Sequence, residues 1–165
     1  PLTFGARGHR HEKDAPDNSR LRAVDYIWAA AMLIKRAVLL ATRGFDTDFS
    51  VYFEEVDFCE RGRQLGYRLV LVPDSFVWHK VGSSANSAWT AYHWNCSKML
   101  LYRKHAKNGF HRIFLTVYAL VYILVDAVRR GSGLRLFSGN RGPLKDALRG
   151  WWAGLREKLD RGGLP

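Results

Sequence analysis

Three acidic residues at the start of a short helix constrain this chain most. Glu54, Glu55 and Asp57 follow an aromatic run, and Gly66 stands where the C-cap of a helix would fall. Between them, Asp57 and Arg61 have the i,i+4 spacing that places two side chains on one helix face. The pattern predicts one short helix that begins at the acids and ends near Gly66.

Apolar runs on both sides of this helix predict strands. Residues 68–73 are rich in β-branched side chains, are too few for a helix and end at a proline, and a second run ends at His79. Upstream, residues 24–35 are almost continuously apolar, which is typical of one or two buried strands, and residues 36–42 fit a short helix. The acids are therefore expected at a helix start and His79 at a strand end, in an α/β arrangement.

Carboxylates in the first turn of a helix have two common uses. The helix dipole favours their ionised form, so such a carboxylate can act as a base at neutral pH. Acidic residues there are also ordinary capping groups. The spacing by itself leaves both uses open.

An ordered series of motifs runs from Val24 to His105. It comprises Val24-Asp25-Tyr26, Ala31-Met-Leu-Ile-Lys-Arg36, Gly44-Phe45-Asp46, Phe53-Glu-Glu-Val-Asp-Phe-Cys-Glu-Arg61, Gly66-Tyr-Arg68, Val77-Trp-His79, Tyr92-x-x-Asn95 and Leu100-Leu-Tyr-Arg-Lys-His105. The series resembles the C-terminal half of the catalytic domain of family 2 glycosyltransferases, and most of all the rhamnosyltransferase-like branch with the inverting GT-A fold.

The resemblance implies an α/β fold, namely the acceptor-side half of a GT-A (Rossmann-like) glycosyltransferase domain followed by C-terminal amphipathic helices. It assigns residues 1–22 to a loop or truncated edge, 23–105 to that half domain and 106–165 to a basic helical tail. The implied reaction moves a sugar, with inversion, from a nucleotide diphosphate sugar to a hydroxyl of a glycan acceptor.

The resemblance also assigns roles to single residues. Glu55 falls at the catalytic base, with Glu54 and Asp57 as supporting acids that orient the acceptor or the neighbouring loop. His79 falls near the metal and the diphosphate, and its alternative is a strand-end histidine held by hydrogen bonds.

The chain departs from the family pattern in four ways. Ala29-Ala30 stands where a small Gly-Ala pair is usual. Glu54-Glu55 stands where Glu-Asp is usual, and Trp94 stands where an arginine is common. The nucleotide-binding half has no counterpart, because Asp46-Thr47-Asp48 follows a turn and not the hydrophobic strand of an Asp-x-Asp metal motif. The divalent metal, Mg or Mn, is therefore expected to be bound mostly by that missing half, and the isolated chain is not expected to transfer sugar.

Aromatic residues gather on the next predicted helix, which begins near Ser87. Trp89, Tyr92 and Trp94 are candidates for acceptor binding, because aromatic faces suit sugar rings. An aromatic stripe at helical spacing is equally a feature of a helix that packs in a core.

Positive charge concentrates towards the C-terminal end. The formal net charge is +11, of which +9 lies in residues 103–165. The run of 13 residues from Ile113 to Val125, apolar or aromatic except for Thr116, falls short of the roughly 20 that a spanning helix needs, and so predicts a buried or interfacial helix. After Pro143, an amphipathic stripe carries Trp151 and Trp152 between basic residues, and such a helix either lies on an anionic membrane or docks on its own protein.

These patterns predict a cytoplasmic protein, peripheral at the inner face of the membrane, with a lipid-linked acceptor. Cys59 and Cys96 form no disulfide framework, which suits a reducing compartment. A non-catalytic fragment or a peripheral membrane-binding module is the alternative. Nucleic-acid binding, suggested by a pI near 10.1, is disfavoured since no recognised nucleic-acid motif is found.

Overall fold

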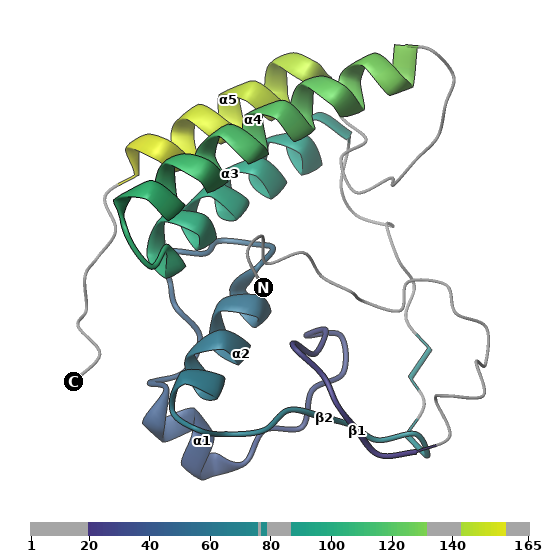
Figure 1. Cartoon of the computed structure of the whole chain (residues 1–165). Coiled ribbons are helices and arrows are strands. Elements are labelled where there is room, and N and C mark those ends of the chain that lie inside the picture. The colour runs from purple at the N-terminus through teal and green to yellow at the C-terminus, as the bar shows by residue number, and fades with distance from the viewer. Residues whose placement is uncertain (1–19, 76, 79–86, 132–142, 158–165) are drawn as a thin grey trace. The chain divides into compact units, whose positions relative to one another are not determined.

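The computed structural model describes residues 20–75, 77–78, 87–131 and 143–157. These residues form two compact units (Figure 1). Unit 1 contains the described residues up to Asp46 and from Glu54 to Trp78. Unit 2 contains Thr47–Phe53 and the described residues from Ser87 onward. Each unit is therefore assembled from segments that are separate in the sequence.

In unit 1, helix α1 (Arg36–Ala41) ends in a Schellman motif. The Gly44 N–H donates to the Leu39 carbonyl (2.9 Å), and the Arg43 N–H donates to the Leu40 carbonyl (3.2 Å). Arg43 and Gly44 both have left-handed backbone, with φ of 59° and 77°. The short helix predicted over residues 36–42 is confirmed, and this turn ends it.

Helix α2 (Glu54–Gln64) begins with the three acids in its first turn. Its end is a second Schellman motif, in which the Gly66 N–H donates to the Arg63 carbonyl (2.9 Å) and the Tyr67 N–H to the Gly62 carbonyl (3.0 Å). Gly66 has a φ of 85°, a conformation that costs glycine little. The predicted helix and its glycine C-cap are confirmed.

Strand content in the described residues is one short ladder, with β1 (Arg22–Ala23) antiparallel to β2 (Val70–Leu71). The prediction of buried strands over residues 24–35 is wrong, because this segment forms turns and irregular chain and its Leu33 is fully exposed. A strand needs a neighbour to satisfy its backbone groups; the Val24 N–H donates to the Leu69 carbonyl (3.1 Å), but the ladder does not continue into residues 25–35. The fold they show is mixed but mostly helical, without a Rossmann-like parallel sheet.

Unit 2 is built on three helices that lie side by side, α3 (Ser87–His105), α4 (Gly109–Gly131) and α5 (Leu144–Arg156) (Figure 1). Ala91, Ile123 and Ala147, one residue from each helix, form a buried cluster at their centre. The helices predicted from about Ser87 and after Pro143 are confirmed.

Glycines bring α5 against the backbone of α3. A Cβ at Gly150 would lie 2.8 Å from the carbonyl carbon of Tyr92, and a Cβ at Gly154 would lie 2.7 Å from the Cβ of Met99. This Gly-x-x-x-Gly spacing allows two helix backbones to approach closely. Arg103 fixes the C-terminal end of α5 by donating to the carbonyls of Gly154 (2.6 Å) and Glu157 (2.8 Å).

Helix α4 is longer than the predicted run of 13 residues. Asn108 caps its start, with its side-chain oxygen accepting from the His111 N–H (2.8 Å). Arg112 and Asp126, the charged residues directly before and after the predicted run, lie inside the helix, the first exposed and the second buried. By length and composition alone, Gly109–Val128 could cross a membrane, and 28% of its apolar window is buried inside the protein.

Residues Thr47–Phe53, called the strap below, pack on α3. The Ser97 hydroxyl donates to the Val51 carbonyl (2.7 Å), and Phe49 is buried with the Lys104 ammonium 5.7 Å from its ring centre. The strap is part of unit 2, yet unit 1 resumes at the next residue, Glu54. The chain therefore passes from unit 1 to unit 2 and back within eight residues.

Candidate functional site

The three acids of α2 lie in different surroundings although they share one helical turn. Asp57 is fully buried and Glu55 is 8% exposed, whereas Glu54 is half-buried. The Oε2 atom of Glu54 is itself buried, without a hydrogen-bond partner among the described residues. These differences in burial and partners separate the roles that the three acids can have.

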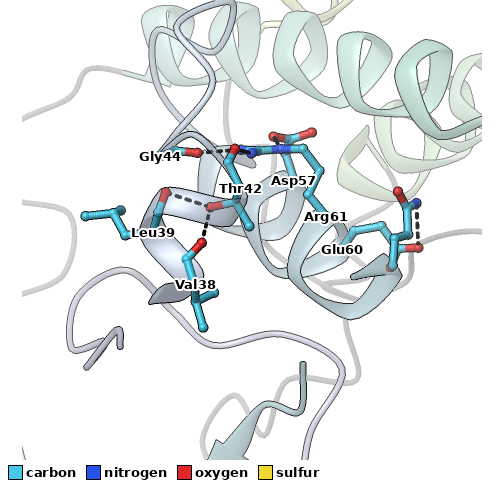
Figure 2. Close-up of polar contacts among 8 residues, drawn as sticks. Val38, Leu39, Thr42, Gly44, Asp57, Glu60 and Arg61 are labelled. Atoms are coloured by element: carbon cyan, nitrogen blue, oxygen red, sulfur yellow. Dashed lines mark hydrogen bonds and ion pairs between the residues drawn. The ribbon is translucent and has the colours of Figure 1, made fainter. Parts of the chain in front are cut away.

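Asp57 is paired with Arg61, and this pair holds the turn that follows α1 (Figure 2). The Arg61 Nε donates to the Asp57 carboxylate (2.8 Å), while its two terminal nitrogens donate to the carbonyls of Thr42 and Gly44, the latter at 2.8 Å. The Thr42 hydroxyl donates back to the Val38 carbonyl (2.8 Å). Asp57 therefore holds the Arg61 guanidinium, and the guanidinium holds the turn at Thr42–Gly44.

Sequence reasoning noted the Asp57–Arg61 spacing but did not count Arg61 among the site residues. The available signal was weak, since i,i+4 pairs of this kind are common on exposed helix faces. What the spacing could not show is that both side chains are buried, with Arg61 only 5% exposed.

Glu55 is a buried carboxylate with no ion-pair partner among the described residues. Burial raises the pKa of Glu55; a hydrogen bond with its own backbone opposes the rise, and the charge of Glu54 adds to it. The helix dipole was expected to favour the ionised form, but desolvation outweighs it. A carboxylate with a raised pKa is a stronger base towards an acceptor proton near neutral pH.

Two aromatic residues in left-handed backbone directly precede the acids. Tyr52 and Phe53 have φ values of 64° and 66°, a region that bulky side chains seldom occupy. Each such residue costs on the order of 1–3 kcal/mol and persists where surrounding contacts hold it, often near functional sites. The strap therefore ends in backbone strain immediately before Glu54.

Two of the three predicted acceptor-binding residues, Trp89 and Trp94 of α3, contact Tyr52 of the strap. The ring of Tyr52 lies edge-on to Trp89 (6.1 Å between centres) and to Trp94 (5.3 Å). The Trp89 ring is also tilted against the His93 ring, with 4.3 Å between centres, and Trp89 is 42% exposed. Tyr92 has a different setting, because its backbone faces Gly150 of α5.

Trp151 and Trp152, the residues predicted to face a membrane, differ in exposure. Trp151 packs partly buried against the central cluster of unit 2, and its ring N–H donates to the Thr116 carbonyl (3.4 Å). Trp152 is 55% exposed, with the Arg156 guanidinium 5.6 Å from its ring. The structure thus shows α5 docked on its own unit, with Trp152 and not Trp151 directed outward.

His79, the predicted metal ligand, lies outside the described residues. Within the part of the chain that the structure describes, no three histidine, cysteine or acidic side chains are grouped so as to hold a metal ion. Cys59 is buried in α2, and burial raises the pKa of its thiol to about 11, so it is protonated at neutral pH.

A lysine in unit 2 lies among three tyrosines. The Lys98 ammonium is 4.3 Å from the ring centre of Tyr122, 5.7 Å from that of Tyr102 and 5.9 Å from that of Tyr118. Burial lowers the pKa of Lys98 from its ordinary value of 10.5 to about 8. The tyrosine faces offset only part of the desolvation of the charge.

Lys98→Met is expected to raise the free energy of unfolding at pH 7 by about 1 kcal/mol, since it replaces a desolvated charge with a side chain of similar shape. Between about pH 8 and pH 10.5 the folded protein binds fewer protons at Lys98 than the unfolded chain does. The stability of the wild type therefore rises with pH across that window.

The advantage of Lys98→Met should accordingly shrink from pH 7 to pH 9.5, as measured by urea unfolding at each pH. Other titrating groups are common to both proteins and cancel in the difference. Lys145→Met, at an exposed position of α5, is the control and should show no such trend. An advantage that stays constant with pH would contradict the prediction.

Comparisons of the chain with protein-family models, with curated proteins and with solved structures each give no match. The likeness to family 2 glycosyltransferases therefore rests on the motif series of residues 24–105.

Proposed function

We propose that this chain is the acceptor-side half of an inverting glycosyltransferase, which moves a sugar from a nucleotide diphosphate sugar to a hydroxyl of a glycan acceptor. The observation that carries the proposal is Glu55, a buried carboxylate with a raised pKa and no cation partner among the described residues. It stands where the motif series places the catalytic base. A buried, perturbed acid of this kind is more typical of catalysis than of capping.

In the proposed reaction, Glu55 accepts the proton of the acceptor hydroxyl as the acceptor oxygen forms a bond to the anomeric carbon of the donor. The bond between that carbon and the diphosphate oxygen breaks, and its electron pair leaves with the nucleotide diphosphate. Attack from the face opposite the leaving group inverts the anomeric configuration. Asp57 has a positioning role, since its pairing with Arg61 fixes the loop at Thr42–Gly44.

Exposed apolar residues in unit 1 support the proposal that this chain is one half of a larger domain. Leu33 and Trp78 are fully exposed, and Val72 is about half exposed. Strands of an α/β domain bury such residues on both faces of a sheet. We propose that further strands of the same domain cover them, and that this remaining part binds the nucleotide and a divalent metal, Mg or Mn, with His79 as a contributing ligand.

The aromatic cluster of unit 2 is the proposed sugar-stacking surface. Trp89 and Trp94, held by Tyr52, offer ring faces of the kind that carbohydrate rings pack on. The proposed location is the inner face of the membrane, with a lipid-linked acceptor.

Glu55→Gln tests the assignment, because it keeps the shape of the side chain and removes the base. In the natural gene product that contains residues 1–165, we expect turnover to fall by about 10²-fold or more, with donor affinity little changed. Transfer would be measured with a panel of radiolabelled nucleotide diphosphate sugars and a lipid extract as acceptor. In a plot of the wild-type rate against pH, the midpoint of the fall on the acidic side should lie above 4.5, the ordinary pKa of a glutamate.

Glu54→Gln, the neighbouring change in the same helical turn, is the matched control and should reduce turnover less. Urea unfolding of both variants separates a chemical effect from a loss of fold. Near-normal turnover of Glu55→Gln would remove this residue from the role of base. An inactive Glu54→Gln variant together with an active Glu55→Gln variant would assign the role of base to Glu54.

A further inference from the structure

Helix α4 presents a continuous apolar stripe to solvent. Nine large apolar or aromatic side chains, each between 37% and 81% exposed, recur three or four residues apart along the helix. They are Phe110, Ile113, Phe114, Val117, Tyr118, Val121, Leu124, Val125 and Val128. These nine residues are called the α4 stripe below.

The packing of α4 within unit 2 uses little of the stripe: at its edge, the ring centre of Tyr118 lies 5.9 Å from the Lys98 ammonium of α3. Its opposite face is already buried, with Leu115 and Ile123 fully enclosed and Ala119 nearly so. Exposed apolar patches of this extent are rare on soluble monomers and mark a surface that binds something. Most of the stripe therefore contributes little to the packing of unit 2.

The charges around the stripe favour an anionic partner. Lys107, just before α4, and Arg112, in its first turn on the face away from the stripe, are exposed, and Asp126, the acidic residue of α4, is buried. No exposed acid is found on α4 among its described side chains. Two copies of a chain with a net charge of +11 repel each other overall, which disfavours a second copy as the partner.

We propose that the α4 stripe lies on an anionic lipid surface, with its apolar side chains in the boundary between headgroups and acyl chains. A helix with one apolar face and basic flanks binds membranes in this way, and each basic residue near an anionic leaflet adds about 1 kcal/mol. The membrane contact therefore belongs to α4 and not, as the sequence suggested, to the tryptophan helix α5.

The helix lies on the membrane and does not cross it. Although α4 is long enough to span, α5 is packed on it and carries exposed Lys145, Arg149 and Arg156. Insertion of α4 would take these charges into hydrocarbon, where each is costly. Contact through one face leaves them in water.

This inference rests on unit 2 and is independent of the sugar transfer proposed for α2. The test is flotation of the full 165-residue chain with vesicles of phosphatidylcholine alone and of phosphatidylcholine with phosphatidylglycerol. The stripe variant is Val117→Asp with Leu124→Asp, two exposed positions that should leave the fold intact. The matched control is Trp152→Asp on α5.

We expect the wild type and Trp152→Asp to float with the phosphatidylglycerol vesicles, and the stripe variant to bind at least about tenfold more weakly. Alkaline carbonate should release the bound protein, as it does for a surface contact. Circular dichroism confirms that each variant is folded, and light scattering reports its oligomeric state.

Three results would overturn the proposal. The first is a wild type that does not float, or a stripe variant that floats equally well. The second is a wild-type dimer that the stripe variant converts to a monomer without any change in vesicle binding, because a second copy would then cover the stripe. The third is binding that resists carbonate, which would make α4 a spanning helix.

Discussion

Gly150→Ala is expected to destabilise unit 2, although alanine is the better helix former. In an open helix interior this change stabilises by roughly 0.5–1 kcal/mol. At Gly150 the new Cβ would lie 2.8 Å from the carbonyl carbon of Tyr92 and 2.9 Å from its Cα. These are backbone atoms that cannot rotate away, so α5 must move off α3, and we expect a loss of about 3 kcal/mol or more in the free energy of unfolding.

Gly62→Ala provides a control for which the free energy of unfolding is not expected to fall. Gly62 also lies inside a helix, but the nearest atom to its added Cβ is a methyl carbon of Val38 at 3.9 Å, an ordinary contact. This variant should be as stable as the wild type or slightly more stable. Urea unfolding followed by circular dichroism measures both, and a Gly150→Ala protein as stable as Gly62→Ala would show that α5 does not touch α3 in this way.

Arg61→Met is expected to lower the free energy of unfolding by about 3–5 kcal/mol. The change leaves the Asp57 carboxylate fully buried without its guanidinium partner, and it removes the donors to the carbonyls of Thr42 and Gly44. The cost comes mainly from the charge that remains, and not from the loss of an attractive pair. Thermal or urea unfolding of the variant measures it.

The double variant Asp57→Leu with Arg61→Met should recover part of the loss, because it also removes the buried carboxylate that has lost its guanidinium. Arg63→Met is the control on the same helix, since Arg63 makes only partly exposed ion pairs with Glu60 (3.0 Å) and Asp25 (3.8 Å). Arg63→Met should lower the free energy of unfolding by no more than about 1 kcal/mol. Equal losses in Arg61→Met and Arg63→Met would mean that the Asp57–Arg61 pair is solvated in solution.

Local signals predicted the helices of this chain well. The acids at Glu54 and the glycine at Gly66 give the limits of α2, and the apolar period after Pro143 gives α5, because caps and helical spacing act over a few residues. The length of α4 was underestimated for a related reason. Arg112 and Asp126 stand on either side of the apolar run and suggested that the helix ends there. A sequence cannot show that the Arg112 side chain reaches solvent and that Asp126 is buried inside the helix bundle.

Long-range contacts are what the sequence did not reveal. The apolar run over residues 24–35 has strand composition, but a strand forms only where a partner pairs with it. Gly150 and Gly154 stand in the sequence at the spacing of close-packed helices, yet the larger Trp151 and Trp152 between them suggested a membrane face. Of the three candidate acids, only burial and pairing separate Glu55 from Asp57.

The strap of residues 47–53 decides how the chain can be divided into separate pieces. A gene fragment that begins after residue 81 would encode α3, α4 and α5 but would lack Phe49 and the Val51 carbonyl that Ser97 binds. A fragment that stops before Glu54 would lack α2, and with it Arg61 and its bonds to Thr42 and Gly44. Because the strap belongs to unit 2 but lies between the two segments of unit 1, no single cut in the chain yields both units intact.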